Sequence, residues 1–498
     1  MRELRAATAA VLMTVIFEQA GAADYQTAVE QLPAPFDAWN VTATPQADSR
    51  IVELGFDSVL LRRRAISHVY LPDAYATAEA PLPVAYFFHG TIRVYTLPGA
   101  DDVFDGLAEQ GVPLGYPFGP GNGRGPTDFV RHSLDRAEFV IVTPDSGPEP
   151  WCESCFFIDG YRGRGVAAES HFYEELIPLV EAVFAVRDDR AGRAVFGRSM
   201  GGGAALIHGL RHPDRFAFVG ALSPSHIDWT EDPLLSYVLW KHYVDGQGYP
   251  PAQVAELTYR NLNPLDLAPN TIGTNQEIVI ILGDGCVDHS EGACDGARLT
   301  DDPQDYFFGA GQEIPLRRNA DQYVPRLLQL GVPIQYIERE GLHGAINRDG
   351  YERYLLPRMN RIFAEGVPDP LRFSYKTADR SFRVWGYDFE VDRPNEEFLA
   401  ILGARLDGRE LVLAGTGSVT VRTPSRFAPA SLHHVVVTPL SPIPPLGEAP
   451  TEMTREADGE GRLEIPVVLG APREIDERRE LVDQGQLRFP QTRIEVAD

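Results

Sequence analysis

The chain has almost no lysine: of its 45 lysine and arginine residues, only Lys241 and Lys376 are lysines. Its 71 acidic residues outnumber the basic ones and give a formal net charge of -26. No local cluster of basic residues reverses this balance. A surface of that sign repels the phosphate backbone of nucleic acids and anionic lipid surfaces. We therefore expect no nucleic-acid partner and no membrane partner.

Cysteine is also scarce, with four residues in 498. The four thiols allow three pairings, and we favour the two local ones, Cys152 with Cys155 and Cys286 with Cys294. A Cys-x-x-Cys can also be a redox pair, but this one follows a proline-rich loop and opens no obvious helix. A zinc site would need further Cys or His ligands at close spacing. The sequence therefore predicts structural disulfides and no metal.

Long apolar runs are missing beyond the first residues. Two arginines within Met1 to Arg5 precede an apolar run from Ala6 to Phe17, and the small residues Ala20 to Ala23 follow. The run has 12 residues, whereas a membrane-spanning helix needs roughly 20. This order is typical of a secretory signal cleaved near Ala22, with an uncleaved anchor as the alternative. We expect a secreted or periplasmic protein, in a compartment where disulfides persist.

The chain is too long for one compact domain, because single hydrophobic cores stop growing at about 250 to 300 residues. Its 44% hydrophobic and 23% charged residues are ordinary for a globular protein. The change in pattern near Gly366 to Pro370 predicts a linker. We divide the chain into a signal peptide at 1–22, a catalytic domain at 23–367 and a β-rich domain at 368–498.

The first large domain alternates short apolar runs with longer helical stretches, which indicates an α/β fold with a mostly parallel sheet. The predicted strands are Ala65 to Tyr70, Val84 to Phe88, Glu138 to Thr143, Ala194 to Phe196, Ala217 to Leu222, Glu277 to Leu282 and Ile334 to Glu338. Apolar spacings of three and four predict helices over Ala168 to Phe184, Gly201 to Arg211, Ala320 to Leu330 and Tyr351 to Phe363.

Helical spacing nearly vanishes after the linker. Seven short runs there alternate with turns and predict an all-β, sandwich-like domain. They are Phe373 to Tyr375, Ser381 to Trp385, Phe398 to Leu402, Glu410 to Ala414, Ser418 to Arg422, His434 to Thr438 and Leu463 to Val468.

The motif Gly197-Arg198-Ser199-Met200-Gly201 lies between a predicted strand and a predicted helix. A nucleophilic serine in such a strand-turn-helix elbow has a strained backbone, so small residues must flank it. Glycines at 197, 201, 202 and 203 meet that requirement. Ser199 is therefore the predicted nucleophile.

A serine hydroxyl needs a base within hydrogen-bond reach, and that base needs an acid to orient it. This fold usually supplies them in the order Ser, Asp, His. Asp284 and Asp288 both follow the buried strand at 277–282, and His343 follows the last strand. We expect His343 to be the base and one of the two aspartates to be the acid.

Backbone amides are expected to bind the negative oxygen of the tetrahedral intermediate. The amides of Met200 and Thr91 are the predicted donors, because Thr91 lies just past the strand at 84–88 and Met200 follows the nucleophile. Trp151 and Trp229 are candidate substrate-binding residues, although core packing explains such aromatic residues equally well.

Together these motifs resemble the putative-esterase family of α/β-hydrolases, which includes esterase D, feruloyl esterases and mycolyltransferases. The resemblance is carried by Val69-Tyr70-Leu71-Pro72, Phe88-His89-Gly90, Val142-Thr143-Pro144-Asp145, Glu175-Leu176-Ile177-Pro178, the Ser199 motif, His212-Pro213-Asp214-Arg215-Phe216 and Leu222-Ser223-Pro224. It implies an α/β-hydrolase fold. The family's Gly-x-x-Asp falls on Asp288 rather than Asp284, and its Gly-x-His falls on His343.

The expected function is that of a secreted serine esterase that acts on small-molecule or polymeric esters without a cofactor. An acyltransferase would use the same three side chains. A surface-binding or polymer-binding protein with a vestigial hydrolase domain is the alternative from another class. The C-terminal domain is the candidate for binding a polymer or surface.

Overall fold

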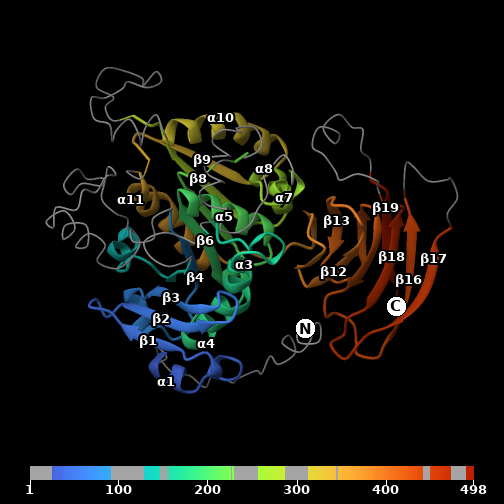
Figure 1. Ribbon diagram of the computed structural model, residues 1–498, viewed down its shortest axis with the longest axis horizontal. Coiled ribbons are helices and arrows are strands. Elements are labelled where there is room, and N and C mark those ends of the chain that lie inside the picture. Colours follow the sequence, from blue (N-terminus) through green and yellow to red (C-terminus); the bar gives the residue numbers. More distant parts are fainter. Residues whose placement is uncertain are drawn as a thin grey trace.

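A computed structural model describes residues 25–90, 128–145, 154, 156–225, 227–228, 256–286, 312–343, 346–440, 449–472 and 489–497. The chain forms two domains that lie side by side (Figure 1). Several predicted features lie outside the described residues, namely the signal segment 1–22, Thr91, Trp151, Cys152, Cys155, Trp229, Asp288 and Cys294.

The N-terminal domain is built on one nine-stranded sheet with the order β1-β2-β3-β5-β4-β6-β7-β8-β9. Strands β4 to β9 are parallel to one another. Strands β1, β2 and β3 extend the sheet beyond β5, and each of them pairs with its neighbour in antiparallel fashion. The strands are β1 (Thr42–Pro45), β2 (Ile51–Ser58), β3 (Arg63–Tyr70), β4 (Val84–Phe88), β5 (Val140–Thr143), β6 (Arg193–Arg198), β7 (Phe218–Leu222), β8 (Glu277–Gly283) and β9 (Ile334–Arg339). Every strand predicted for this domain is present, and β1 and β2 are additional.

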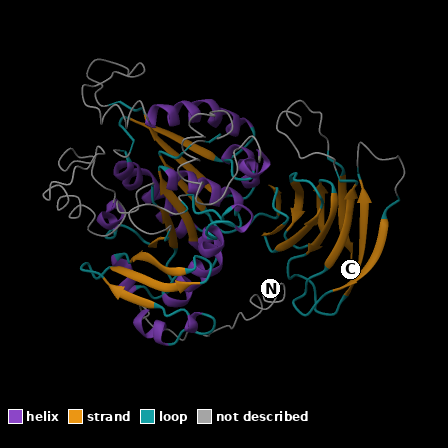
Figure 2. Cartoon of the chain, in the orientation of Figure 1, coloured by secondary structure: helices purple, strands orange, loops and turns teal. Residues whose placement is uncertain are grey.

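Helices cover both faces of this sheet (Figure 2). They include α1 (Tyr25–Glu30), α3 (Ala168–Ser170), α4 (Ile177–Val183), α5 (Met200–Arg211), α7 (Glu256–Arg260), α8 (Pro264–Leu267), α10 (Ile314–Gln329), α11 (Asn347–Gly350) and α12 (Leu356–Glu365). A π-helical segment, η6 (His171–Leu176), joins α3 to α4, and a second one, η11 (Tyr351–Leu355), precedes α12. One apolar core lies on each face, because the buried strands are apolar on both sides.

The C-terminal domain consists of two antiparallel sheets that share one apolar core. The larger sheet has the order β10-β13-β14-β19-β16-β17, and the smaller one has the order β11-β12-β15-β18. Their strands are β10 (Arg372–Thr377), β11 (Ser381–Val384), β12 (Tyr387–Asp392), β13 (Leu399–Arg405), β14 (Glu410–Ala414), β15 (Gly417–Arg422), β16 (Leu432–Pro439), β17 (Thr451–Glu456), β18 (Glu464–Gly470) and β19 (Gln491–Ala497). The predicted fold class, α/β with a mostly parallel sheet followed by an all-β domain, is confirmed.

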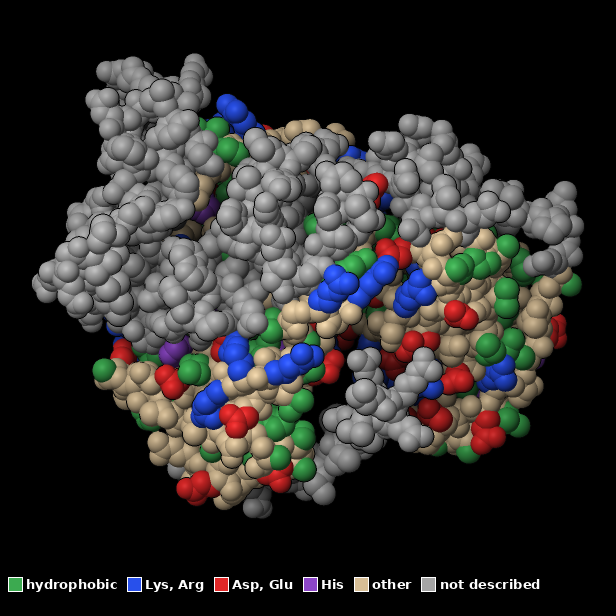
Figure 3. All heavy atoms as spheres, viewed as in Figure 1, with side chains coloured by type: hydrophobic (Ala, Val, Ile, Leu, Met, Phe, Trp, Pro, Cys, Tyr) green, Lys and Arg blue, Asp and Glu red, His purple; other side chains and the backbone are tan. Residues whose placement is uncertain are grey.

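The first domain ends with α12 at Glu365, and the sandwich begins with β10 at Arg372. Acidic and basic side chains are intermixed where the two domains face each other (Figure 3). Within the described part of the chain, no helix combines the length and the apolar character needed to cross a membrane.

Candidate active site

Ser199 occupies the sharp turn between β6 and α5. Its backbone has φ 54° and ψ -124°, a conformation that is rare for a residue other than glycine and is typical of strained functional sites. The Ser199 amide donates to the Leu222 carbonyl at 2.8 Å, and the Ser199 carbonyl accepts from Ser225 at 3.1 Å. These bonds to the end of β7 hold the turn while the hydroxyl stays partly exposed.

The glycines of the motif are needed for close backbone approach. A Cβ on Gly201 would lie 2.0 Å from the Phe88 carbonyl oxygen, and a Cβ on Gly197 would lie 2.1 Å from the Gly201 carbonyl oxygen. No side chain fits at such distances. The sequence argument for small flanking residues therefore has a direct steric basis in the elbow.

His343 lies in the loop after β9, within hydrogen-bond distance of Ser199. Its Nε2 atom is 2.9 Å from Ser199 Oγ, and its Nδ1 atom is 2.6 Å from Glu313 Oε2. A carboxylate only accepts hydrogen bonds, so Nδ1 carries the proton and Nε2 is left to accept from the serine hydroxyl. This is the arrangement of a nucleophile, a general base and an orienting acid.

Glu313 supplies the carboxylate, and sequence reasoning had not singled it out. It lies immediately before α10 with its side chain fully buried. Its Oε1 atom accepts from the Ser223 hydroxyl at 2.8 Å and from the Gly283 amide at 2.5 Å. Three donors therefore satisfy the buried charge, and the positive end of the α10 dipole adds to them.

Asp284, the alternative acid of the sequence analysis, binds backbone amides instead of His343. Its Oδ1 atom accepts from the amides of Cys286 and Gly341, both at 3.0 Å. Asp284 follows β8 directly, so its short side chain turns back onto the neighbouring backbone. The structure brings Glu313 rather than Asp284 against His343, and Asp288 lies outside the described residues.

Ser223 and Gly283 both contact the Glu313 carboxylate. Ser223 follows β7 with φ 44°, and this unusual backbone accompanies its hydrogen bond to the carboxylate. At Gly283, an added Cβ would lie 2.3 Å from the Gly341 carbonyl oxygen and 3.0 Å from Glu313 Oε1. Residues at the ends of β7 and β8 thus hold the Glu313 carboxylate in place.

The loop after β4 faces the nucleophile. The last residue of β4, Phe88, and the two residues that follow it, His89 and Gly90, are called the oxyanion loop below, after the role proposed for this segment. The position of a Gly90 Cβ is 3.4 Å from Ser199 Cβ, and His89 Nδ1 lies 2.7 Å from the Gly90 carbonyl oxygen, to which it donates. Met200 is buried and opens α5, so no helical carbonyl accepts from its amide. Such an amide suits a developing negative charge. Thr91 lies outside the described residues.

The remaining predicted site features are less fully described. Cys286 is not a free thiol, but the other three cysteines lie outside the described residues, so both predicted pairings stay predictions. The same holds for Trp151 and Trp229. In the described part of the chain, no cluster of three or more His, Cys, Asp or Glu side chains could hold a metal ion.

A family model matches one segment of the N-terminal domain. Residues 166–298 match the model of the family described as "Putative esterase". The matched segment contains Ser199 and the ends of β6, β7 and β8, and it stops before Glu313 and His343.

Curated relatives match over part of the chain. Esterase MT1326 and Esterase Rv1288 of two Mycobacterium tuberculosis strains are each 29% identical over 153 residues, which is 30% of this chain. The match spans 27% of each relative, so the chain covers only about a quarter of their length.

Two solved structures are similar to this chain over about two thirds of its length. A ferulic acid esterase is 23% identical, with 63% of this chain and 98% of that chain covered and a TM-score of 0.39. An S-formylglutathione hydrolase from Agrobacterium tumefaciens is 17% identical, with 66% and 100% covered and a TM-score of 0.41.

Proposed function

We propose that this protein is a serine hydrolase that cleaves carboxylic esters through an acyl-enzyme formed on Ser199. The observation that carries the proposal is the pair of contacts made by His343, 2.9 Å to the Ser199 hydroxyl and 2.6 Å to the Glu313 carboxylate. The match to the putative-esterase family supports an ester as the substrate.

In the first half of the reaction, Ser199 Oγ attacks the ester carbonyl carbon while His343 Nε2 takes the hydroxyl proton. Glu313 holds the ring and stabilises the imidazolium that forms. The amides of Met200 and Thr91 are the proposed donors to the tetrahedral oxyanion. The imidazolium then returns the proton to the alcohol oxygen as the carbon–oxygen bond breaks, and the alcohol leaves.

In the second half, water gives a proton to His343 and attacks the acyl carbon. Collapse of the second tetrahedral intermediate releases the carboxylic acid, and Ser199 Oγ regains its proton from His343. No step uses a cofactor. If an alcohol replaced water here, the product would be a new ester, which is the acyl-transfer alternative; comparing products with and without added alcohols separates the two outcomes.

Hydrolysis of chromogenic esters of graded acyl length tests the proposal. Wild-type protein should hydrolyse at least one ester, and Ser199→Ala should abolish turnover while far-UV and near-UV circular dichroism stay unchanged. Turnover retained by Ser199→Ala would refute the assignment of the nucleophile.

We also propose that the protein is exported, that the signal segment 1–22 is removed and that the cysteines pair locally. The charged, apolar and small-residue order at the N-terminus supports this. Intact mass of the protein recovered outside the cytoplasm, with and without reduction, tests all three points. A mass that still includes residues 1–22 would contradict cleavage.

A further inference from the structure

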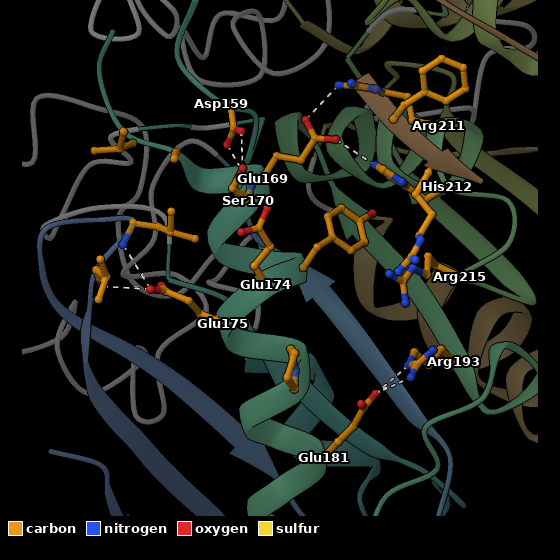
Figure 4. A pocket seen from close by; sticks show the side chains of 18 of the residues that line it. Asp159, Glu169, Ser170, Glu174, Glu175, Glu181, Arg193, Arg211, His212 and Arg215 are labelled. Carbon is orange, nitrogen blue, oxygen red and sulfur yellow. Dashed lines mark hydrogen bonds and ion pairs between the residues drawn. The ribbon is translucent and has the colours of Figure 1, made fainter. Parts of the chain in front are cut away.

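A polar cluster joins the two domains at the C-terminal end of α5, the helix that follows Ser199. A cleft of about 3080 Å³ runs between the domains, and Glu169, Arg211 and His212 line it, whereas the proposed triad does not. In Figure 4, Glu169 lies between Arg211 and His212 and points toward both. The cluster therefore connects α3, α5 and the sandwich at a distance from the proposed chemistry.

The charges in this cluster are held in fixed geometry. Arg211 pairs with Glu169 at 2.9 Å and with Asp379 of the sandwich at 2.8 Å, while His212 Nε2 lies 2.9 Å from Glu169. The Arg211 and Glu169 side chains are only 11% and 12% exposed. Burial alone would raise the pKa of Glu169, but Arg211 and His212 outweigh it and hold the pKa below its usual range. Glu169 therefore stays ionised as the centre of the cluster.

The sandwich holds Arg211 at two points. Asp379 accepts from the Arg211 guanidinium and is itself fixed by Asn261 Nδ2 at 2.8 Å and Thr377 Oγ1 at 2.9 Å. The Tyr375 hydroxyl donates to the Arg211 carbonyl at 2.8 Å. That carbonyl belongs to the last turn of α5, where carbonyls have no partner within the helix. The first strand of the sandwich thus completes the C-terminal end of α5.

The cluster continues into the first domain through Tyr173 and His208. The Tyr173 ring lies 4.2 Å from the His212 ring, and its hydroxyl is 3.1 Å from His208 Nδ1. His208 Nε2 is 3.0 Å from the Phe157 carbonyl oxygen. A carbonyl only accepts, so Nε2 carries the proton and Nδ1 accepts from the tyrosine. Burial lowers the pKa of His208 to about 4, so the ring is neutral at ordinary pH.

Phe157 links His208 to the oxyanion loop, because its ring packs against Phe88 and His89. Its backbone has φ 55°, and its ring centroid lies 4.4 Å from that of Phe88 and 5.3 Å from that of His89. The His208 ring also packs on Phe88, at 4.9 Å. The oxyanion loop therefore rests on Phe157 and His208, which are joined by a hydrogen bond.

We propose that the C-terminal sandwich is a positioning domain for the oxyanion loop, acting through Asp379, Arg211 and the Tyr173–His208–Phe157 link. Asp379 and Tyr375 are then positioning residues that touch no substrate. This inference rests on the proposed ester hydrolysis for its kinetic part. Its structural part, that the sandwich orders the loop, can be tested without any enzymatic activity.

The kinetic test compares Asp379→Asn with Asp369→Asn. The control also removes a carboxylate that faces an arginine of the first domain, since Asp369 lies 3.6 Å from Arg190, but it has no contact with the cluster. The kcat for a chromogenic ester is measured per site titrated with a fluorophosphonate, which corrects for unfolded protein. Asp379→Asn should lower kcat roughly tenfold and change KM by less than about twofold. The expected loss is smaller than that caused by removing an oxyanion donor outright, because the loop is loosened but its amides remain. Asp369→Asn should match wild type.

Amide hydrogen exchange gives the second readout and needs no activity. Peptides covering 84–90 and 156–164 should exchange faster in Asp379→Asn than in Asp369→Asn, because loosened segments open more often. If wild-type protein hydrolyses no ester, the proposed function fails while this exchange result still decides the positioning role.

Tyr375→Phe keeps the proposal testable if Asp379→Asn does not fold. It removes one hydroxyl and should shift both kcat and exchange in the same direction by a smaller factor. The proposal is overturned if the folded variants match Asp369→Asn in kcat and in the exchange of both peptides.

Discussion

Glu313 fixes the tautomer of His343 through one short contact, from its Oε2 atom to Nδ1 at 2.6 Å. The carboxylate has no contact with solvent, because its exposed side-chain fraction is 0%. In the proposed reaction, a buried charge of this kind stabilises the imidazolium that forms during acylation and keeps the base in the productive tautomer.

Glu313→Gln should therefore lower kcat/KM for ester hydrolysis by roughly 1000-fold to 10,000-fold, since an amide facing Nδ1 favours the wrong tautomer. Asp284→Asn is the matched control. Its side-chain oxygen can still accept from the amides of Cys286 and Gly341, so a loss below about tenfold is expected. Equal losses in the two variants would remove Glu313 from the role of acid.

Ser223 combines a positive φ of 44° with a hydrogen bond to Glu313. Ser223→Ala should lower kcat roughly tenfold to a hundredfold at nearly constant KM, because a hydrogen bond to a charged group is lost. Ser225→Ala serves as the control, since the Ser225 hydroxyl is buried and has no hydrogen-bond partner in the described part of the chain. Steady-state kinetics on both variants measures the difference, and an equal effect would contradict a specific role for Ser223.

The side chains proposed as nucleophile and base could be selected from the sequence because local patterns mark them. Ser199 has glycines around it, and His343 follows the last strand of the sheet. Glu313 has no such mark. It lies at the end of the connection between β8 and α10, and its only distinctive feature is that it comes just before a helix that starts with Ile314-Pro315. The rule that places the acid just after the strand gave Asp284 and Asp288, and the resemblance selected Asp288. The short Asp284 side chain binds the amides of Cys286 and Gly341 instead, and Asp288 lies outside the described residues.

At the scale of elements, the π-helical segment η6 ties helix α4 to the hairpin between β2 and β3. Its Glu175 carboxylate accepts from the Ser58 hydroxyl at 2.5 Å and from the Val59 and Leu60 amides at 2.9 and 3.1 Å, and lies 2.7 Å from His171 Nδ1. Burial alone would raise the pKa of Glu175, but the hydrogen bonds from His171 and Ser58 outweigh it and lower the pKa.

Glu175→Gln should lower the free energy of unfolding at pH 7 by about 1 to 3 kcal/mol, because charge-assisted hydrogen bonds are weakened. A lowered folded-state pKa gives stability that is complete above the unfolded value, about 4.3 for Glu, and is lost as the pH falls through the folded value. Urea unfolding at several pH values should therefore show the variant and wild type converging below about pH 4. Glu365→Gln, at an exposed ion pair with Arg361, should change stability by under about 0.5 kcal/mol; a difference that persists at low pH would contradict the account.

Element type was predictable where apolar patterns are long. The helix expected over 168–184 is present, but its middle is π-helical, and one extra residue per turn leaves no trace in an apolar pattern. The sandwich strands β12, β17 and β19 were missed. Strand β19 alternates buried and exposed residues over Gln491–Ala497 near the end of the chain, and its pairing with β14 and β16 makes it central in the sheet. Such long-range pairing is invisible in a local pattern.

At the scale of the whole molecule, the net charge of -26 acts on any charged substrate that approaches. Like charges repel, and salt screens the repulsion with a Debye length of about 10 Å at 0.1 M. We expect kcat/KM for an ester with a free carboxylate to rise severalfold between about 0.01 and 0.5 M salt, and that for a neutral ester of equal length to stay nearly constant. Stopped-flow or plate assays across that range measure both, and a flat response for the anionic ester would count against the idea.

The central claim is that Ser199 is the nucleophile and that His343 and Glu313 activate it. Reaction with a fluorophosphonate followed by peptide mass mapping tests this claim most directly, because the probe reacts preferentially with an activated serine and the adduct stays on it. The account predicts a single adduct on Ser199 in wild-type protein, none in Ser199→Ala, and much slower labelling in Glu313→Gln than in Asp284→Asn. An adduct on another residue, labelling that persists in Ser199→Ala, or equal rates in the two acid variants would contradict it.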